Sequence, residues 1–186
     1  MKILIASDIH GSAHYAQIIK EAMKKHNCDK LLLLGDLLYH GPRNPLPYNY
    51  DPKQVIAILN SMKEHIIAIR GNCDAEVDQM VLEFPIMADY TTIVMEDYTI
   101  FATHGHLFHP DHLPRLQKGD VFFFGHVHVP IAEKKDGIHI INPGSITLPK
   151  QDSEHSYGIL ENHRYQRYDE HHQLLSHYSI HNIEMM

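Results

Sequence analysis

The chain alternates between short apolar runs and longer polar segments, and most of the apolar runs stop at a polar residue that can bind a metal ion. Five such runs occupy residues 3–6, 31–34, 66–69, 99–103 and 121–124. Apolar runs of this length, rich in branched and aromatic residues, are typical of buried β-strands. The polar residues that follow them are Asp8 and His10, Asp36, Asn72, His104 and His106, and His126 and His128.

Helix signals lie between the first strands. Ser12 is an expected N-cap, and Asp51-Pro52 combines an N-cap with a proline in the first turn. Each is followed by apolar residues at helical spacing. These are Tyr15, Ile18, Ile19, Ala22 and Met23 in the first helix, and Val55, Ile56, Leu59 and Met62 in the second. Strand, helix and strand in this order predict a βαβ unit with parallel strands, and hence an α/β fold.

The second half of the chain predicts mainly strands. Two hairpins are expected, residues 91–95 with 98–103 and residues 129–133 with 138–141, the latter turning at Asp136-Gly137. Residues 157–160 and 165–168 are expected as edge strands, and residues 111–117 as a short amphipathic helix. No internal repeat or linker interrupts the pattern, so residues 1–186 are predicted to form a single domain.

The polar residues at the strand ends are expected to form one site. Ligands of open α/β sheets bind beyond the carboxyl ends of the strands, and glycines beside these residues allow the backbone to approach closely. Residues two apart in an extended chain project to the same side, which brings Asp8 and His10 together. One Asp-x-His is weak evidence, but five strands ending in this way favour a metal site.

The ordered motifs resemble those of the calcineurin-like metallophosphoesterases, and more narrowly those of the YfcE-type bacterial phosphodiesterases. They are Asp8-x-His10, Gly35-Asp36, Arg70-Gly71-Asn72-Cys73-Asp74, His104-Gly105-His106, Gly125-His126-x-His128 and Asn142-Pro143-Gly144-Ser145. The resemblance extends from residue 1 to about residue 160. It implies a two-sheet αββα sandwich and a phosphodiesterase that acts with two divalent metal ions.

Carried over residue by residue, the resemblance implies two ligand sets that share Asp36. One ion is bound by Asp8, His10, Asp36 and His128, and the other by Asp36, Asn72, His104 and His126. Nitrogen and oxygen ligands without a thiolate favour manganese, with iron, zinc and nickel as alternatives. Two ions about 3.5–4 Å apart ionise a shared water, and the bridging hydroxide is expected to attack phosphorus in line.

Four further residues are candidates for contact with the substrate. Arg43 and His40 lie on the proline-rich loop 39–50, which is either a substrate wall or a packed surface loop. Cys73 occupies the position where many relatives have a histidine that protonates the leaving group. A thiol is a weaker acid than an imidazolium, so we expect good activity only on diesters with acidic leaving groups. His106 is either a substitute acid or a histidine bonded to local backbone.

Composition narrows the class of protein. The formal net charge of −7 argues against an extended nucleic-acid surface, and no apolar run is long enough to span a bilayer. Two cysteines do not make a disulfide framework. A cytoplasmic enzyme is therefore expected, and the edge strands predict a homo-oligomer. The histidines of the C-terminal region are interpreted as a solvated edge: His155, His163, His171, His172, His177 and His181.

The predicted function is hydrolysis of a small-molecule phosphodiester. Two alternatives remain open at this point. One is an interaction scaffold of the same fold that has lost catalysis, although such a scaffold is not expected to keep all seven ligand positions. The other is a phosphomonoesterase or pyrophosphohydrolase of the same superfamily.

Overall fold

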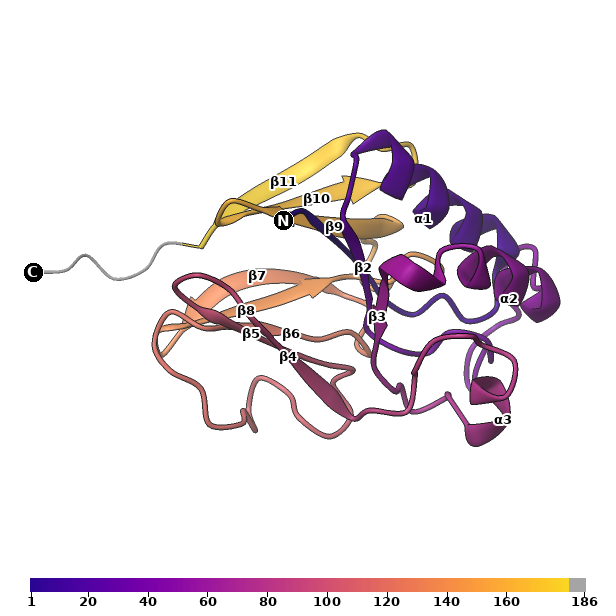
Figure 1. Cartoon of the computed structure of the whole chain (residues 1–186), viewed down its shortest axis with the longest axis horizontal. Coiled ribbons are helices and arrows are strands. Elements are labelled where there is room, and N and C mark those ends of the chain that lie inside the picture. Colours follow the sequence, from indigo (N-terminus) through magenta and orange to yellow (C-terminus); the bar gives the residue numbers. More distant parts are fainter. Residues whose placement is uncertain (181–186) are drawn as a thin grey trace, which may run out of the picture.

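A computed structural model describes residues 1–180 as two stacked β-sheets with helices on one side (Figure 1). The first sheet has the strand order β11-β10-β9-β1-β2-β3, and the second has the order β4-β5-β6-β8-β7. The first sheet consists of β1 (Ile3–Ala6), β2 (Lys30–Leu33), β3 (Ile66–Ala68), β9 (Ser156–Glu161), β10 (Arg164–Asp169) and β11 (Leu174–Ser179). The second consists of β4 (Tyr90–Val94), β5 (Thr99–Thr103), β6 (Val121–Phe123), β7 (Pro130–Lys135) and β8 (Ile138–Pro143).

The helices start where the sequence predicts. In α1 (Ala13–Lys25) the Ser12 hydroxyl accepts a hydrogen bond from the Tyr15 N–H, and Asp51 caps α2 (Pro52–Asn60) in the same way. Both helices cover the outer face of the first sheet, where β1 pairs in parallel with β2 and β2 with β3. The α/β prediction is confirmed. Two short elements complete the helical segments, η1 (Lys63–His65) and α3 (Glu76–Gln79).

The strand β2 shows how the core is divided. Leu31 and Leu33 pack against the helices, whereas Leu32 and Leu34 pack against the second sheet. All four are fully buried because both faces of the first sheet are covered. This explains the continuous apolar run, which an alternating, half-exposed strand would not show.

The predicted helix at residues 111–117 is wrong. No helix forms there, and the segment is a loop that covers the outer face of the second sheet. Leu113 and Leu116 pack on this face as the apolar pattern requires, but Pro114 lacks an N–H and prevents a helical turn. The two-sheet sandwich is confirmed, with this loop in place of a second helical layer.

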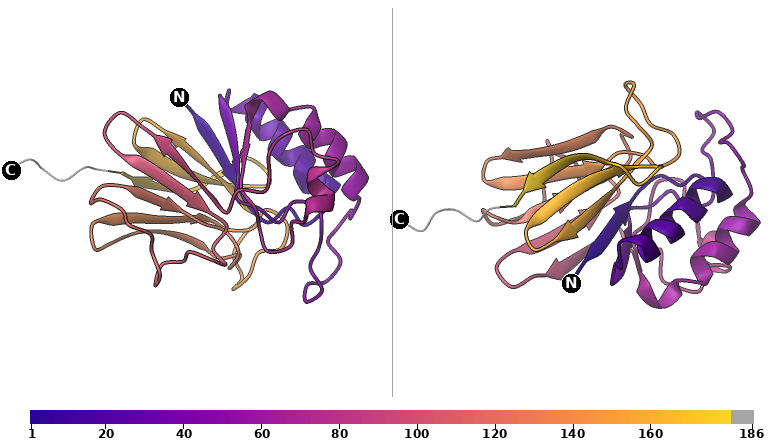
Figure 2. Two further views of the ribbon diagram at one scale, coloured as in Figure 1. Left: turned by 60° about the horizontal axis from the view of Figure 1, so that its bottom comes forward. Right: turned by 90° about the horizontal axis from the view of Figure 1, so that it is seen from above.

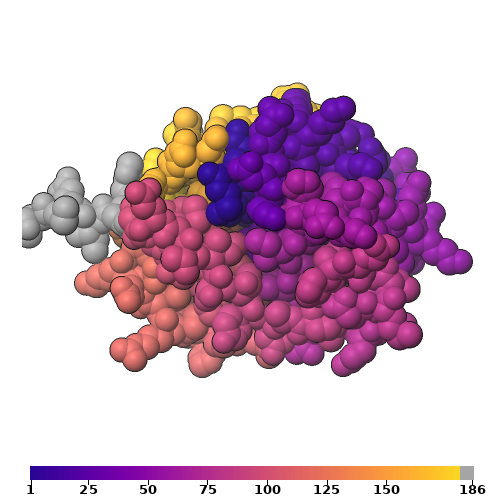
Figure 3. Space-filling model, in the orientation of Figure 1, coloured from indigo at the N-terminus to yellow at the C-terminus, as the bar shows by residue number. Residues whose placement is uncertain are grey.

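The prediction that residues 157–160 and 165–168 form edge strands is wrong. β9 pairs with β1 and β10, and β10 pairs with β9 and β11, so that β11 forms the edge. The chain returns antiparallel to β1 through β9, and in Figure 3 the yellow C-terminal part of the chain borders the indigo N-terminal part. Local patterns give no neighbour order, and β11 was not predicted. Within residues 1–180, no helix has the length and apolar character needed to cross a membrane.

Candidate metal centre

Segments that follow five strands meet at one edge of the two sheets. They follow β1, β2, β3, β5 and β6, as the sequence predicts. A cavity of about 530 Å³ lies over them, with His10, Asp36, Asn72, His126 and His128 in its wall. The predicted ligands are therefore brought together.

The reason given for the convergence of Asp8 and His10 is wrong. β1 ends at Ala6, and both residues have left-handed backbone, with φ of 59° and 50°. Asp36, His126 and His128 share this conformation. Such backbone is strained in residues other than glycine and gathers at functional sites. The side chains converge because the chain turns sharply after each strand.

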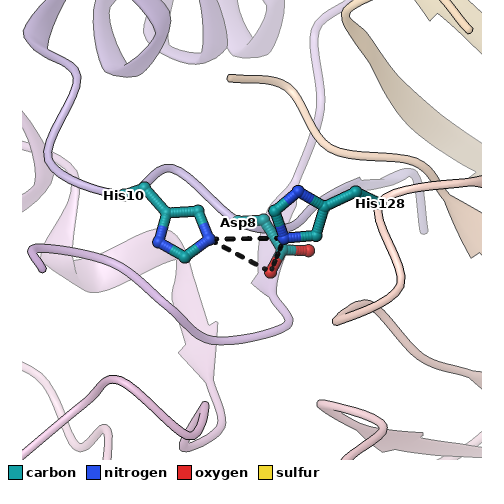
Figure 4. A group of neighbouring side chains, drawn as sticks. All are labelled: Asp8, His10 and His128. Carbon is teal, nitrogen blue, oxygen red and sulfur yellow. Dashed lines mark hydrogen bonds and ion pairs between the residues drawn. The ribbon is translucent and has the colours of Figure 1, made fainter. Parts of the chain in front are cut away.

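Asp8, His10 and His128 form the first group of the site, and their side chains point toward one another (Figure 4). The Asp8 Oδ1 atom lies 3.3 Å from His128 Nε2 and 3.7 Å from His10 Nε2. The two imidazole Nε2 atoms are 3.4 Å apart. All three residues are buried, and their ligand atoms are close enough together to hold one ion.

Asp36 joins this group to a second one. Its Oδ2 atom lies 3.7 Å from His10 Nε2 and 3.4 Å from His104 Nε2. His104 Nε2 lies 3.0 Å from Asn72 Oδ1 and 3.2 Å from His126 Nδ1. Asp36 thus faces both sets of side chains, which is the arrangement that a bridging carboxylate needs.

Hydrogen bonds to backbone carbonyls orient three of the imidazoles. The Nδ1 atoms of His10, His104 and His128 lie 2.8, 2.6 and 2.6 Å from the carbonyl oxygens of Tyr39, Leu34 and Leu148. A carbonyl oxygen only accepts, so each Nδ1 carries a proton, and in the neutral ring the Nε2 lone pair would then face the centre. This is the tautomer that a metal ligand requires.

The buried carboxylates of the site favour the binding of positive charge. Asp8 Oδ1 is buried and receives no hydrogen bond of good geometry from residues 1–180. It faces the imidazoles of His128 and His10 at 3.3 and 3.7 Å, and burying such a carboxylate is costly unless a cation balances its charge. Burial works to lower the pKa of His104, but the nearby Asp36 and Asp8 carboxylates raise it to about 9. The pKa of His128 is raised in the same way by Asp8. Protons or metal cations satisfy this demand, and the donor set fits divalent metal ions.

Asp74 supports the site, although the sequence analysis gave it no role of its own. It is buried, and its carboxylate accepts hydrogen bonds from the N–H groups of Asp36, Leu37 and Gly71 at 2.7–2.8 Å. It therefore links the two loops that carry Asp36 and Asn72. The only signal was its place in the motif Gly71-Asn72-Cys73-Asp74.

The Asn142–Ser145 turn supports two loops of the site. The Asn142 side chain donates to the Gly125 carbonyl oxygen, and the Ser145 hydroxyl donates to that of Asp8. Both residues are fully buried. The turn therefore holds the loops that carry His126 and Asp8.

The candidate substrate residues lie in different surroundings. Arg43 and Cys73 line the cavity, whereas His40 packs against the rings of Tyr39 and Tyr50 and is not part of its wall. Burial raises the pKa of the Cys73 thiol to about 12, with the Asp36 carboxylate as the next cause. The His106 ring centre is 5.4 Å from that of His104, outside the cavity wall. Their roles stay predictions.

The histidines of the C-terminal region form no metal cluster within residues 1–180. Two of them are not simply solvated. His155 stacks on Tyr15, and His172 bonds through the Tyr157 hydroxyl to His26. His181 lies outside the described residues.

Comparison with known proteins agrees with this geometry. The protein-family model of the calcineurin-like phosphoesterase superfamily domain matches residues 1–164. The phosphodiesterase YfcE of Escherichia coli K12 is 47% identical over 162 residues, which are 87% of this chain and 88% of that protein. The phosphodiesterase MJ0936 of Methanocaldococcus jannaschii is 28% identical over 153 residues, or 77% and 83% of the two chains.

A solved structure of E. coli YfcE superimposes with a TM-score of 0.95 at 42% identity, covering 97% of this chain and 100% of that one. Vps29 of Entamoeba histolytica, solved with Zn²⁺, has a TM-score of 0.62 at 16% identity, covering 97% and 100%, and shares the fold. The family match spans most of the chain and includes every predicted ligand. The chain belongs to the calcineurin-like phosphoesterase superfamily.

Proposed function

We propose that this protein is a metal-dependent phosphodiesterase that hydrolyses small-molecule phosphodiesters at a two-metal centre. The observation that carries the proposal is the position of Asp36, whose Oδ2 faces His10 Nε2 at 3.7 Å and His104 Nε2 at 3.4 Å. A carboxylate between two sets of imidazole lone pairs fits two ions better than one. The phosphodiesterase name of the 47% identical relative supports the reaction class.

Each ligand has a definite role in this proposal. Asp8, His10, Asp36 and His128 would hold one ion, and Asp36, Asn72, His104 and His126 the other. The bound ions supply Lewis acidity and lower the pKa of water. The buried carboxylates provide the negative charge that attracts cations, and the Nδ1 bonds keep the imidazoles aimed at them.

The chain offers no strong acid for the leaving group at the Cys73 position. A thiol is a weaker acid than an imidazolium, and burial raises the pKa of Cys73 further, so this group releases its proton poorly. The proposed enzyme therefore favours substrates with leaving groups that depart without protonation, such as aryl phosphodiesters.

We further propose manganese as the native metal, because the proposed ligands are imidazole nitrogens and oxygens and include no thiolate. A cytoplasmic location agrees with the two free thiols, Cys28 and Cys73. Residues 1–186 are proposed to act as one domain. A homo-oligomer stays a prediction, to be checked by light scattering after size-exclusion chromatography.

The test is reconstitution of the chelated protein. Hydrolysis of a bis(aryl) phosphate and of the matching aryl monophosphate is measured without metal and with Mn²⁺, Fe²⁺, Zn²⁺ or Ni²⁺. We expect diester turnover only with metal, and loss of turnover in Asp36→Ala and Asn72→Ala. Asp78→Asn, a half-exposed carboxylate that caps α3, is the matched control. Full activity of the metal-free protein contradicts the proposal, and faster monoester turnover assigns the alternative activity.

A further inference from the structure

The cavity over the predicted ligands is larger than one phosphate requires. Its volume is about 530 Å³. Five heavy atoms of a phosphate, each given the ~30 Å³ of a water molecule in the liquid, occupy about 150 Å³. Two ions and a hydroxide at the same ~30 Å³ each raise this to about 240 Å³, so about half of the cavity is still available to the ester arms of a substrate.

The wall of this cavity is polar. Apart from the imidazoles of predicted ligands, no aromatic side chain of residues 1–180 belongs to it. Its apolar contributions come mainly from Pro42 and Val127. Recognition of a nucleobase commonly uses aromatic stacking, so the wall favours a small polar arm.

Two cationic side chains line the cavity in addition to the predicted ligands. They are Arg43 and Lys150, both exposed and neither in an ion pair within residues 1–180. Among the described residues, the only carboxylate in the wall is Asp36, which belongs to the proposed metal centre. The two cations are thus left for a ligand.

Both cations lie on segments that are bonded to the Asp8 group. The loop of Arg43 begins at Tyr39, whose carbonyl oxygen accepts the His10 Nδ1 proton. Lys150 donates its backbone N–H to the His128 carbonyl oxygen at 3.1 Å. Both loops project from the same side of the molecule (Figure 2, right). The cations therefore flank the His10 and His128 side of the centre.

We propose that Arg43 and Lys150 form a subsite for a second anionic group of the substrate. The preferred substrates are then phosphodiesters in which one ester arm carries a carboxylate or a phosphate. This inference rests on the proposed phosphodiesterase function. The proposed metal ions balance the negative charge of the scissile phosphate, so both cationic side chains remain available to the ester arm. A guanidinium pairs with carboxylate or phosphate through two hydrogen bonds, and an ammonium adds a point charge.

Kinetics on matched substrates test the subsite. Aryl phosphodiesters with the same leaving group carry a methyl, a 2-carboxyethyl, a 2-phosphoethyl or a 2-(trimethylammonio)ethyl arm. With the Mn²⁺ enzyme we expect kcat/KM about tenfold higher for an anionic arm than for methyl, chiefly through KM, as for one charge-assisted hydrogen bond. The cationic arm is disfavoured. The carboxylate and phosphate arms show which anion the subsite prefers.

Arg43→Gln and Lys150→Gln each reduce the anionic-to-methyl ratio about three- to tenfold, and the double variant removes the preference. Lys53→Gln, an exposed lysine on α2 away from the cavity, is the matched control and keeps the ratio. Added salt lowers the ratio in the parent enzyme, because both cations are exposed.

A binding measurement separates this inference from the proposed function. Alkyl methylphosphonate monoesters with the same arms are titrated calorimetrically into the Mn²⁺ protein. Turnover without arm selectivity, or selectivity that survives the double variant, overturns the subsite and leaves the phosphodiesterase standing. Selective binding without turnover of any diester rejects the proposed function and supports the subsite.

Discussion

Gly71 provides a sharp test of how closely the loops at the centre must approach. A Cβ atom at this position would lie 2.0 Å from Asp36 Oδ1 and 2.4 Å from the Asp36 nitrogen. The φ angle of Gly71 is not in the left-handed region. The effect of Gly71→Ala is therefore steric and falls directly on the predicted bridging carboxylate.

The size of the effect follows from these distances. Real Cβ atoms essentially never come within 3.0 Å of such neighbours, so Asp36 Oδ1 must move by about 1 Å. The same oxygen accepts the Cys73 N–H at 2.8 Å, and that bond is lost or distorted. Disturbing groups that orient a metal ligand typically lowers metal affinity by about 10–100-fold. The strain of an overpacked site adds a loss of about 1–3 kcal/mol in the free energy of unfolding.

Mn²⁺ affinity is measured by calorimetry or electron paramagnetic resonance, and the free energy of unfolding is measured in urea for the same variants. Gly137→Ala is the control, because its hairpin is far from the centre, its φ is +88° and its Cβ would lie 2.8 Å from Lys118 Cγ. Both variants should lose stability, but only Gly71→Ala should lose Mn²⁺ affinity. A folded Gly71→Ala protein that binds Mn²⁺ like the parent would refute the reasoning.

Three other predictions concern metal, leaving group and pH. Mn²⁺ at about 100 times its dissociation constant should add about 2.7 kcal/mol to the free energy of unfolding, and Asp36→Ala should abolish the gain in a thermal melt. Cys73→His should accelerate alkyl diesters more than aryl diesters; an unchanged dependence of rate on leaving-group pKa contradicts a missing acid. Burial lowers the pKa of His26 and His172, so the unfolded chain binds more protons. The contribution of these two histidines to stability should then fall as pH drops through the unfolded value of about 6.5, and urea titrations should show less of this loss in His172→Gln than in the parent.

The convergence of the ligands could be predicted from sequence because it depends on local patterns. Apolar runs give the strands, and parallel strands carry their carboxyl ends to one edge of a sheet. The predicted ligands, from Asp8 to His128, lie shortly after these runs end. No long-range information was needed to expect one site.

The parts that sequence did not predict depend on pairing between distant segments. β9 is an inner strand because it pairs with β1 across most of the chain length. The local sequence around Asp74 does not predict its burial, which depends on hydrogen bonds from the distant Asp36 loop. The apolar spacing of Leu113 and Leu116 fits both a helix and a loop that packs on a sheet. These contacts join segments that are distant in the sequence, so local patterns do not predict them.

The backbone of the site connects the fold to metal binding. Five of the seven predicted ligands have left-handed φ, between 50° and 67°, and each such residue costs about 1–2 kcal/mol. Bonds between loops hold this geometry, among them Asp8 N–H to the Gly35 carbonyl oxygen and His10 N–H to that of Asp36. In an extended strand, successive side chains point to opposite faces of the sheet. Ligands on such a strand would point away from the neighbouring loops. The strained turns direct the side chains into one cavity instead. Because hydrogen bonds between the loops hold these turns, the fold itself fixes where the side chains of the predicted ligands point.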